Sequence, residues 1–143
     1  MILIIYDDAG RLIQSIHEPI PKGYSEQLTE RGTPHLLLGE AGEPTPDVHA
    51  MYRSKWVEDG ELRNRPYLPA SLDRQTIAAD GQDEARLTGL PVPCDVTITG
   101  PDGRSILTVE DGELALTADV AATYAIAIDH WPHLPWRAEV IAT

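Results

Sequence analysis

Short apolar runs separated by turn residues are the feature that most constrains this chain, above all after Pro69. Within these runs apolar and polar residues alternate, as they do at residues 94–98. A period of two puts one set of side chains on one face of a β-strand, and burial of that face fixes the register. About seven such runs fit into the last ~75 residues, with turn residues roughly every 8 to 12 positions, which is typical of a β-sandwich. The runs lie at residues 76–79, 85–87, 94–98, 106–109, 114–116, 124–128 and 137–143.

The first part of the chain shows the same strand and turn rhythm on a smaller scale. Residues 2–6 and 11–16 flank the sequence Asp-Asp-Ala-Gly, which predicts a β-hairpin. Further short strands are expected at residues 36–38, 48–52 and 56–57, with a turn at 58–61 and one or two helical turns at 25–30. This pattern predicts a small β-meander.

A proline-rich segment separates the two patterns. Residues 63–69 contain Pro66 and Pro69, and the residue before each proline is biased toward extended backbone. We therefore expect an all-β fold with two domains. Residues 1–66 form a β-rich docking region, and residues 67–143 form an immunoglobulin-like β-sandwich.

Composition narrows the classes of partner and compartment. Twelve prolines and eleven glycines suit short strands and turns, and a net charge of -12 opposes binding to nucleic acid or to anionic lipid. Cys94 is the one cysteine, which excludes an intramolecular disulfide and a cysteine-rich zinc site. The N-terminal apolar run lacks the basic segment of a secretion signal, and no run approaches the ~20 apolar residues of a membrane span. We expect synthesis in the cytoplasm and no membrane insertion.

Several segments resemble a known group of modules. Residues 72–85, with Thr-Ile followed by Ala-Asp-Gly, residues 89–91 and residues 109–114 resemble the bacterial immunoglobulin-like modules attached to phage tail and tail-fibre proteins. Tyr124 fits the closing tyrosine-containing strand of such modules, although residues 120–122 replace the usual proline-glycine turn.

A second resemblance lies upstream of the sandwich. Residues 56–66 resemble the short hairpin and proline-rich lead-in of small virion proteins of tailed phages, so that the two resemblances together cover about residues 52–143. The two resemblances imply a structural role in the virion, and they imply no catalytic or ligand-binding residues.

One cluster of residue types suggests a binding site. His130, Trp131, His133 and Trp136 lie within seven residues, and two imidazoles beside a tryptophan could bind a metal or line a sugar site. The simpler interpretation is a loop that joins the last two strands, with a tryptophan covering the end of the sandwich. Exposed aromatic residues of such a loop could contact a partner. No third metal ligand is suggested nearby, so no metal is expected.

Other candidate chemistry favours structural roles. Asp80, Asp83 and Glu84 are close enough to suggest calcium, but the Asp-x-Asp-x-Asp-Gly order is absent, and a solvated turn is favoured. Cys94 takes an inward position of an alternating strand and is expected to be a core thiol. The sequence contains no nucleophile elbow, phosphate-binding loop or zinc-protease helix. A glycosidase-type carboxylate pair stays open, because its separation depends on the fold.

The expected function is therefore a non-enzymatic phage virion protein without a cofactor, located in the tail, tail fibre or baseplate region. Its partners would be other tail or baseplate proteins and further copies of itself, with a trimer as the first expectation. Two alternatives stay open. One is a carbohydrate- or receptor-binding module that contacts cell-surface glycan, with Trp131, Trp136 and Tyr124 as candidate stacking groups, and the other is a cytoplasmic tail assembly factor.

Overall fold

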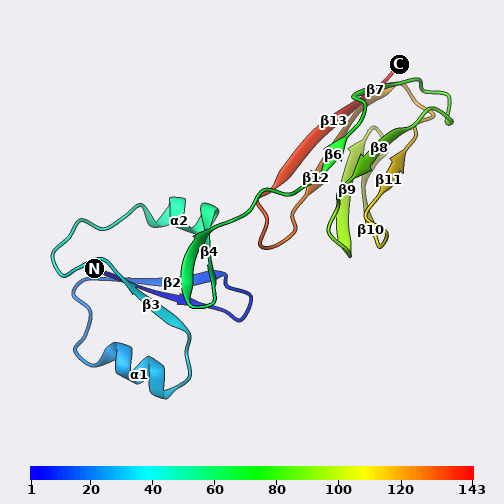
Figure 1. Cartoon of the computed structure of the whole chain (residues 1–143). Coiled ribbons are helices and arrows are strands. Elements are labelled where there is room, and N and C mark those ends of the chain that lie inside the picture. Colours follow the sequence, from blue (N-terminus) through cyan, green and yellow to red (C-terminus); the bar gives the residue numbers. More distant parts are fainter. The chain divides into compact units, whose positions relative to one another are not determined.

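The structure is a computed structural model that describes all residues 1–143, and most of the regular structure of the chain consists of β-strands (Figure 1). The expected all-β fold class is confirmed, with two short helices as the other regular elements. The chain forms two compact units, Met1–Arg65 and Pro66–Thr143. The division falls inside the proline-rich segment.

The first unit is organised around a strand that is buried on both faces. β1 (Ile2–Tyr6) is the centre of a sheet with the order β2-β1-β3, in which β2 is Leu12–His17 and β3 is His35–Leu38. Its side chains alternate between two apolar clusters, with Ile2 and Ile4 in one and Leu3 and Ile5 in the other. Burial on both faces explains why β1 reads as an unbroken apolar run.

The two faces of β1 are covered by different elements. Helix α1 (Tyr24–Glu30) places Leu28 against one face, in the cluster of Leu3 and Ile5. On the other face lie helix α2 (Val48–Ser54) and the hairpin of β4 (Lys55–Glu58) and β5 (Glu61–Asn64). The β4 backbone is tied to the first hairpin, because the N–H of Val57 donates to the carbonyl of Gly10 at 2.9 Å.

Residues 48–52 lie in helix α2, so the strand expected there is wrong. Val48, Met51 and Tyr52 all pack on the cluster of Ile2 and Ile4, and their i, i+3, i+4 spacing is that of one helix face. The side chain of Asp47 accepts from the N–H of Ala50 at 3.1 Å and caps the start of the helix. The predicted turn at residues 58–61 does join a strand pair.

The second unit consists of two sheets. The five-stranded sheet has the order β10-β9-β12-β13-β7, and the three-stranded sheet has the order β11-β8-β6. All seven runs expected from the sequence contain a strand, and β6 is an additional one. The strands are β6 (Ser71–Leu72), β7 (Thr76–Ile77), β8 (Ala85–Thr88), β9 (Cys94–Gly100), β10 (Gly103–Val109), β11 (Leu114–Leu116), β12 (Ala122–Ile128) and β13 (Trp136–Ala142).

The inward residues of both sheets form one core. Leu87 of β8, Val96 of β9 and Ile126 and Ile128 of β12 are almost completely buried within it. The intervening residues of these strands are more exposed, which is the period-two pattern that the sequence predicts.

The opening segment of the second unit contributes to both sheets. β6 pairs with β8 in one sheet, and β7 runs parallel to β13 in the other. Three backbone bonds hold this parallel edge. The N–H of Ile141 donates to the carbonyl of Gln75 at 2.7 Å, and the N–H of Thr143 donates to the carbonyl of Ile77 at 3.0 Å. The N–H of Ala79 donates to the carbonyl of Thr143 at 2.9 Å.

Candidate functional site

The loop between β12 and β13 brings the two predicted histidines together. The Nδ1 atoms of His130 and His133 lie 3.3 Å apart, and the ring centroids are separated by 5.4 Å. The turn itself imposes this pairing, because the N–H of His133 donates to the carbonyl of His130 at 2.8 Å. Both rings are half-buried. No group of three or more His, Cys, Asp or Glu side chains in the chain is arranged to hold a metal ion.

The two tryptophans of this loop region differ in their surroundings. Trp136 is the first residue of β13 and packs against the main core of the second unit. Trp131 lies in the loop, is half-buried and is not among the side chains of that core. The loop is anchored at its far end, where the N–H of Leu134 donates to the carbonyl of Pro66 at 2.8 Å. Of the predicted cluster, Trp136 thus belongs to the core, whereas Trp131 and the two imidazoles lie half-buried in the loop.

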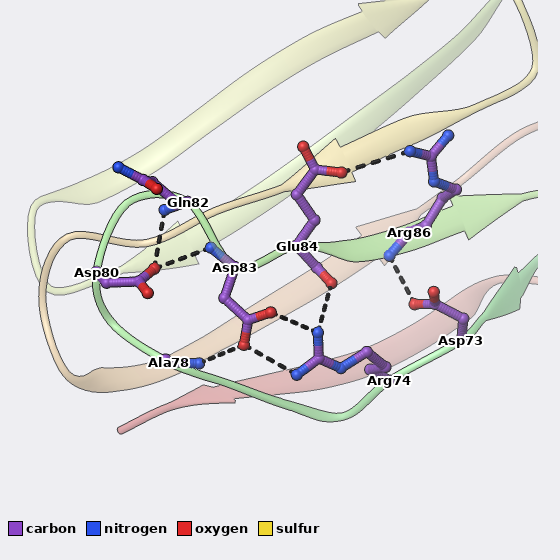
Figure 2. Close-up of polar contacts among 8 residues, drawn as sticks. All are labelled: Asp73, Arg74, Ala78, Asp80, Gln82, Asp83, Glu84 and Arg86. Atoms are coloured by element: carbon purple, nitrogen blue, oxygen red, sulfur yellow. Dashed lines mark hydrogen bonds and ion pairs between the residues drawn. The ribbon is translucent and has the colours of Figure 1, made fainter.

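The acidic turn that suggested calcium is closed by donors of the chain itself (Figure 2). The guanidinium of Arg74 contacts both carboxylate oxygens of Asp83, with Nη2 at 2.9 Å from Oδ2, and its Nη1 also donates to the carbonyl of Glu84 at 3.2 Å. The backbone N–H of Ala78 donates to the same Asp83 oxygen at 2.8 Å. Asp80 accepts from the N–H of Gln82 and of Asp83 at 2.9 and 2.8 Å.

These contacts change the acidity of the turn. The Arg74 hydrogen bond, with the N–H of Ala78 behind it, lowers the pKa of Asp83 to about 2. The pKa of Asp80 is lowered by the backbone N–H groups of Asp83 and Gln82. Hydrogen bonds and a nearby cation favour the ionised carboxylate, so both groups are held as anions by the fold. The turn therefore has a structural role, because its hydrogen bonds connect Arg74 to the residues that lead into β8.

Cys94 is placed as the sequence predicts. Its side chain is 1% exposed in the core of the second unit, and burial raises the pKa of the thiol. A raised pKa reduces the thiolate fraction on which nucleophilic reactivity depends.

Tyr124 has a structural role that sequence reasoning missed. Its hydroxyl donates to the carbonyl of Val120 at 2.9 Å, and its ring packs against the core. The ring lies over Gly100, where an added Cβ would come within 2.6 Å of two ring carbons. The spacing of a tyrosine near the start of a strand and a turn four residues upstream was the available signal.

The edge strand β10 is a second feature that the sequence did not reveal. Ile106 is 62% exposed and Leu107 is 40% exposed, although both lie in the middle of the strand. A groove of about 470 Å3 lies on the same sheet away from this edge, over β12 and β13, where Ala125 and Ala127 carry small side chains. Edge strands of this kind are sites at which chains associate.

Comparison with protein-family models, curated proteins and solved structures finds no match to this chain. No helix of the chain is long and apolar enough to cross a membrane.

Proposed function

We propose that the second unit is an immunoglobulin-like domain and that the chain is a non-enzymatic structural protein of a tailed-phage virion, near the tail, tail fibre or baseplate. The observation that carries the proposal is the strand order of the second unit together with the Tyr124 contact. Both features support the resemblance of residues 72–124 to the immunoglobulin-like modules of phage tail proteins.

The strand order supports this fold in detail. In immunoglobulin domains the first, second and fifth strands share one sheet, and the third, sixth and seventh share the other. Here β6, β8 and β11 take the first arrangement, while β9, β12 and β13 take the second. β10 lies beside β9, as the additional strand of variable-type domains lies beside the third strand.

The Tyr124 contact is a second, independent support. A tyrosine near the start of the sixth strand, whose hydroxyl bonds to the backbone a few residues upstream, is a hallmark of immunoglobulin domains. Tyr124 occupies the third position of β12 and bonds to Val120. Its hydroxyl and ring are therefore used within the domain, which disfavours Tyr124 as a sugar-stacking group.

In this proposal the first unit docks on other tail or baseplate proteins and the second unit is a spacer or decoration. A structural role agrees with the surroundings of the carboxylates and of the one thiol. The carboxylates of the acidic turn bond to donors of the chain, and Cys94 is buried in the core.

The test is mass spectrometry of phage particles purified from the source lysate, combined with gold-labelled antibody on intact particles. Labelling of the tail, fibres or baseplate supports the proposal. Presence in the lysate but not in mature particles overturns it and favours the assembly factor or a cellular binding module.

A second candidate function is binding of cell-surface glycan by the loop between β12 and β13. The observation that favours it is the half-buried Trp131 beside the paired imidazoles of His130 and His133. Aromatic rings with a polar neighbour are suited to such contacts.

A further inference from the structure

We propose that β10 is a self-association edge, through which two copies of this chain pair antiparallel about a two-fold axis at Ile106 and join their five-stranded sheets. The inference goes beyond the proposed virion role and does not depend on it. It concerns residues 103–109 and their neighbours on β9.

The first observation is an edge that lacks the usual protection. β10 is seven residues long, pairs only with β9, and is the longest edge strand of the chain. Natural edge strands are usually short or carry proline, lysine or a bulge, because their unpaired backbone groups can pair with another chain. β10 contains no proline and no lysine, its one charged residue is Arg104, and its pairing with β9 runs without a register shift from Gly103 to Val109.

The second observation is apolar exposure on both faces of the same strand. Ile106 pairs with Thr97 on the outer face, and Leu107 pairs with Val96 on the inner face. Leu107 is nevertheless 40% exposed, whereas Val96 is completely buried. The three-stranded sheet therefore covers β9 but leaves Leu107 partly uncovered at the edge. A partner strand beside β10 would cover both side chains.

The third observation is that the strand is complementary to itself. An antiparallel pair centred on Ile106 matches all seven residues of β10 with the same seven residues of a second copy. It places Ile106 opposite Ile106 on the outer face, and it makes the two Leu107 side chains diagonal neighbours on the inner face. Such a contact is isologous and closes after two chains. It therefore favours a dimer over the trimer expected from the sequence.

Charge complementarity sets the register. Arg104 is on the outer face, exposed, and has no ion pair within the chain. In the proposed pair it lies opposite Thr108 of the second copy, and the hydroxyl of Thr108 bonds to Asp95 at 2.7 Å. Asp95 of the second copy is then two strand spacings away, about 10 Å between Cα atoms, within reach of an extended arginine. The two-fold axis forms this charge pair twice.

Within one copy the same two residues are far apart. Arg104 pairs with Thr99 and Asp95 pairs with Thr108, so they are separated by four residues along the strands, about 13 Å. A functional interaction between Arg104 and Asp95 therefore requires two chains.

The test is sedimentation equilibrium of the full chain and its variants at about 0.15 M salt, where repulsion between chains of net charge -12 is screened beyond about 8 Å. The wild-type chain is expected to be a dimer in reversible equilibrium with monomer. Arg104→Glu and Asp95→Arg are each expected to raise the dissociation constant about tenfold or more, because two like-charge contacts replace two ion pairs. A mixture of the two variants is expected to recover dimer, since both charge pairs are opposite in the mixed dimer.

Two controls make the result specific. Glu110→Arg mixed with Arg104→Glu tests a pairing in which the partner strand is shifted by two residues and the two-fold axis lies at Leu107, so that Glu110 would face Arg104, and this mixture should not restore the dimer. Ile106→Lys should dissociate the dimer, whereas Ile13→Lys changes an isoleucine of nearly equal exposure, 59%, on β2 and should not.

Circular dichroism of each variant verifies that the fold is intact. A monomer at the highest soluble concentration, a trimer, a dimer that is unaffected by Arg104→Glu and Ile106→Lys, or recovery with Glu110→Arg in place of Asp95→Arg would each overturn the proposal. Because purified protein is used, these outcomes are distinct from the presence or absence of the chain in particles.

Discussion

The hydroxyl of Tyr124 donates to the carbonyl oxygen of Val120, four residues upstream, at 2.9 Å. This bond ties the start of β12 to the turn that precedes it, while the ring of the same tyrosine lies on the core and over Gly100. One side chain thereby fixes the entry of the chain into the central strand of the larger sheet.

Removal of this hydroxyl is expected to destabilise the second unit. Tyr124→Phe keeps the ring and leaves the Val120 carbonyl without its donor, which should lower the free energy of unfolding by about 0.5–1.5 kcal/mol. Urea unfolding followed by far-ultraviolet circular dichroism measures the change. Tyr67→Phe is the matched control, because Tyr67 is 85% exposed, and its effect should be close to zero. Equal effects of the two substitutions would contradict a structural role for the Tyr124 bond.

Gly100 is expected to be required by the same ring. Gly100→Ala brings a methyl group to within 2.6 Å of two ring carbons of Tyr124, and the resulting overpacking should cost about 1–3 kcal/mol of stability. A double-mutant cycle with Tyr124→Leu separates this clash from a general preference for glycine. We expect Gly100→Ala to be better tolerated in the Tyr124→Leu background. An identical cost in both backgrounds would show that the ring is not the cause.

The Arg74–Asp83 ion pair predicts an acid-dependent contribution to stability. The pKa of Asp83 is about 2 in the folded chain and near the ordinary value of about 3.9 when unfolded. A lowered folded-state pKa stabilises the fold above about pH 4, and this stabilisation is lost as the pH falls toward 2. Arg74→Gln should therefore raise the pKa of Asp83, as measured by carboxyl NMR titration. It should also make the free energy of unfolding depend less on pH between about pH 4 and pH 2.

The control for this titration lies in the first unit. Arg63→Gln removes an exposed ion pair with Glu61 and should leave the pKa of Asp83 at about 2. If Arg74→Gln also left it unchanged, the N–H of Ala78 would be the dominant cause of the shift.

Cys94 is expected to react only when the second unit opens. Burial and a raised pKa both reduce access to its thiolate, so reaction with a disulfide reagent at pH 8 should be at least about 100-fold slower in the folded chain than in urea. Absorbance of the released thiol measures both rates. Rapid reaction of the folded protein would place Cys94 outside the core.

The loop between β12 and β13 gives a test of glycan binding. Trp136 packs against the core, whereas Trp131 does not belong to it, so acrylamide should quench fluorescence more strongly in Trp136→Phe, which retains Trp131, than in Trp131→Phe. If the loop binds glycan, the sugar should protect Trp131 from quenching, and Trp131→Ala should abolish binding. Unchanged binding in Trp131→Ala would exclude this loop as the sugar site.

Period-two alternation predicted the strands of the second unit, because it directly reports burial on one face. It did not predict their order, and the order decides that Leu107 lies uncovered while Val96 is buried. The prediction of a strand at residues 48–52 is wrong because helix α2 has only seven residues, and about two helical turns give a weak helical periodicity. The Asp47 cap and the spacing of Val48 and Met51 were the signals available there.

The candidate site was predicted in part. The sequence grouped His130 and His133, and the turn between them determines their contact. The use of Arg74 to close the acidic turn depends on a nine-residue separation that no local pattern indicates.

The parallel pairing of β7 with β13 has a mechanical consequence. Tension applied to the second unit through Pro66 and Thr143 would draw these two strands in opposite directions along their own axes. The bonds of Ile141 to Gln75, Thr143 to Ile77 and Ala79 to Thr143 would then be loaded together in shear instead of opening one after another. We therefore expect this edge to resist extension of the domain more strongly than a strand pair whose hydrogen bonds open one after another.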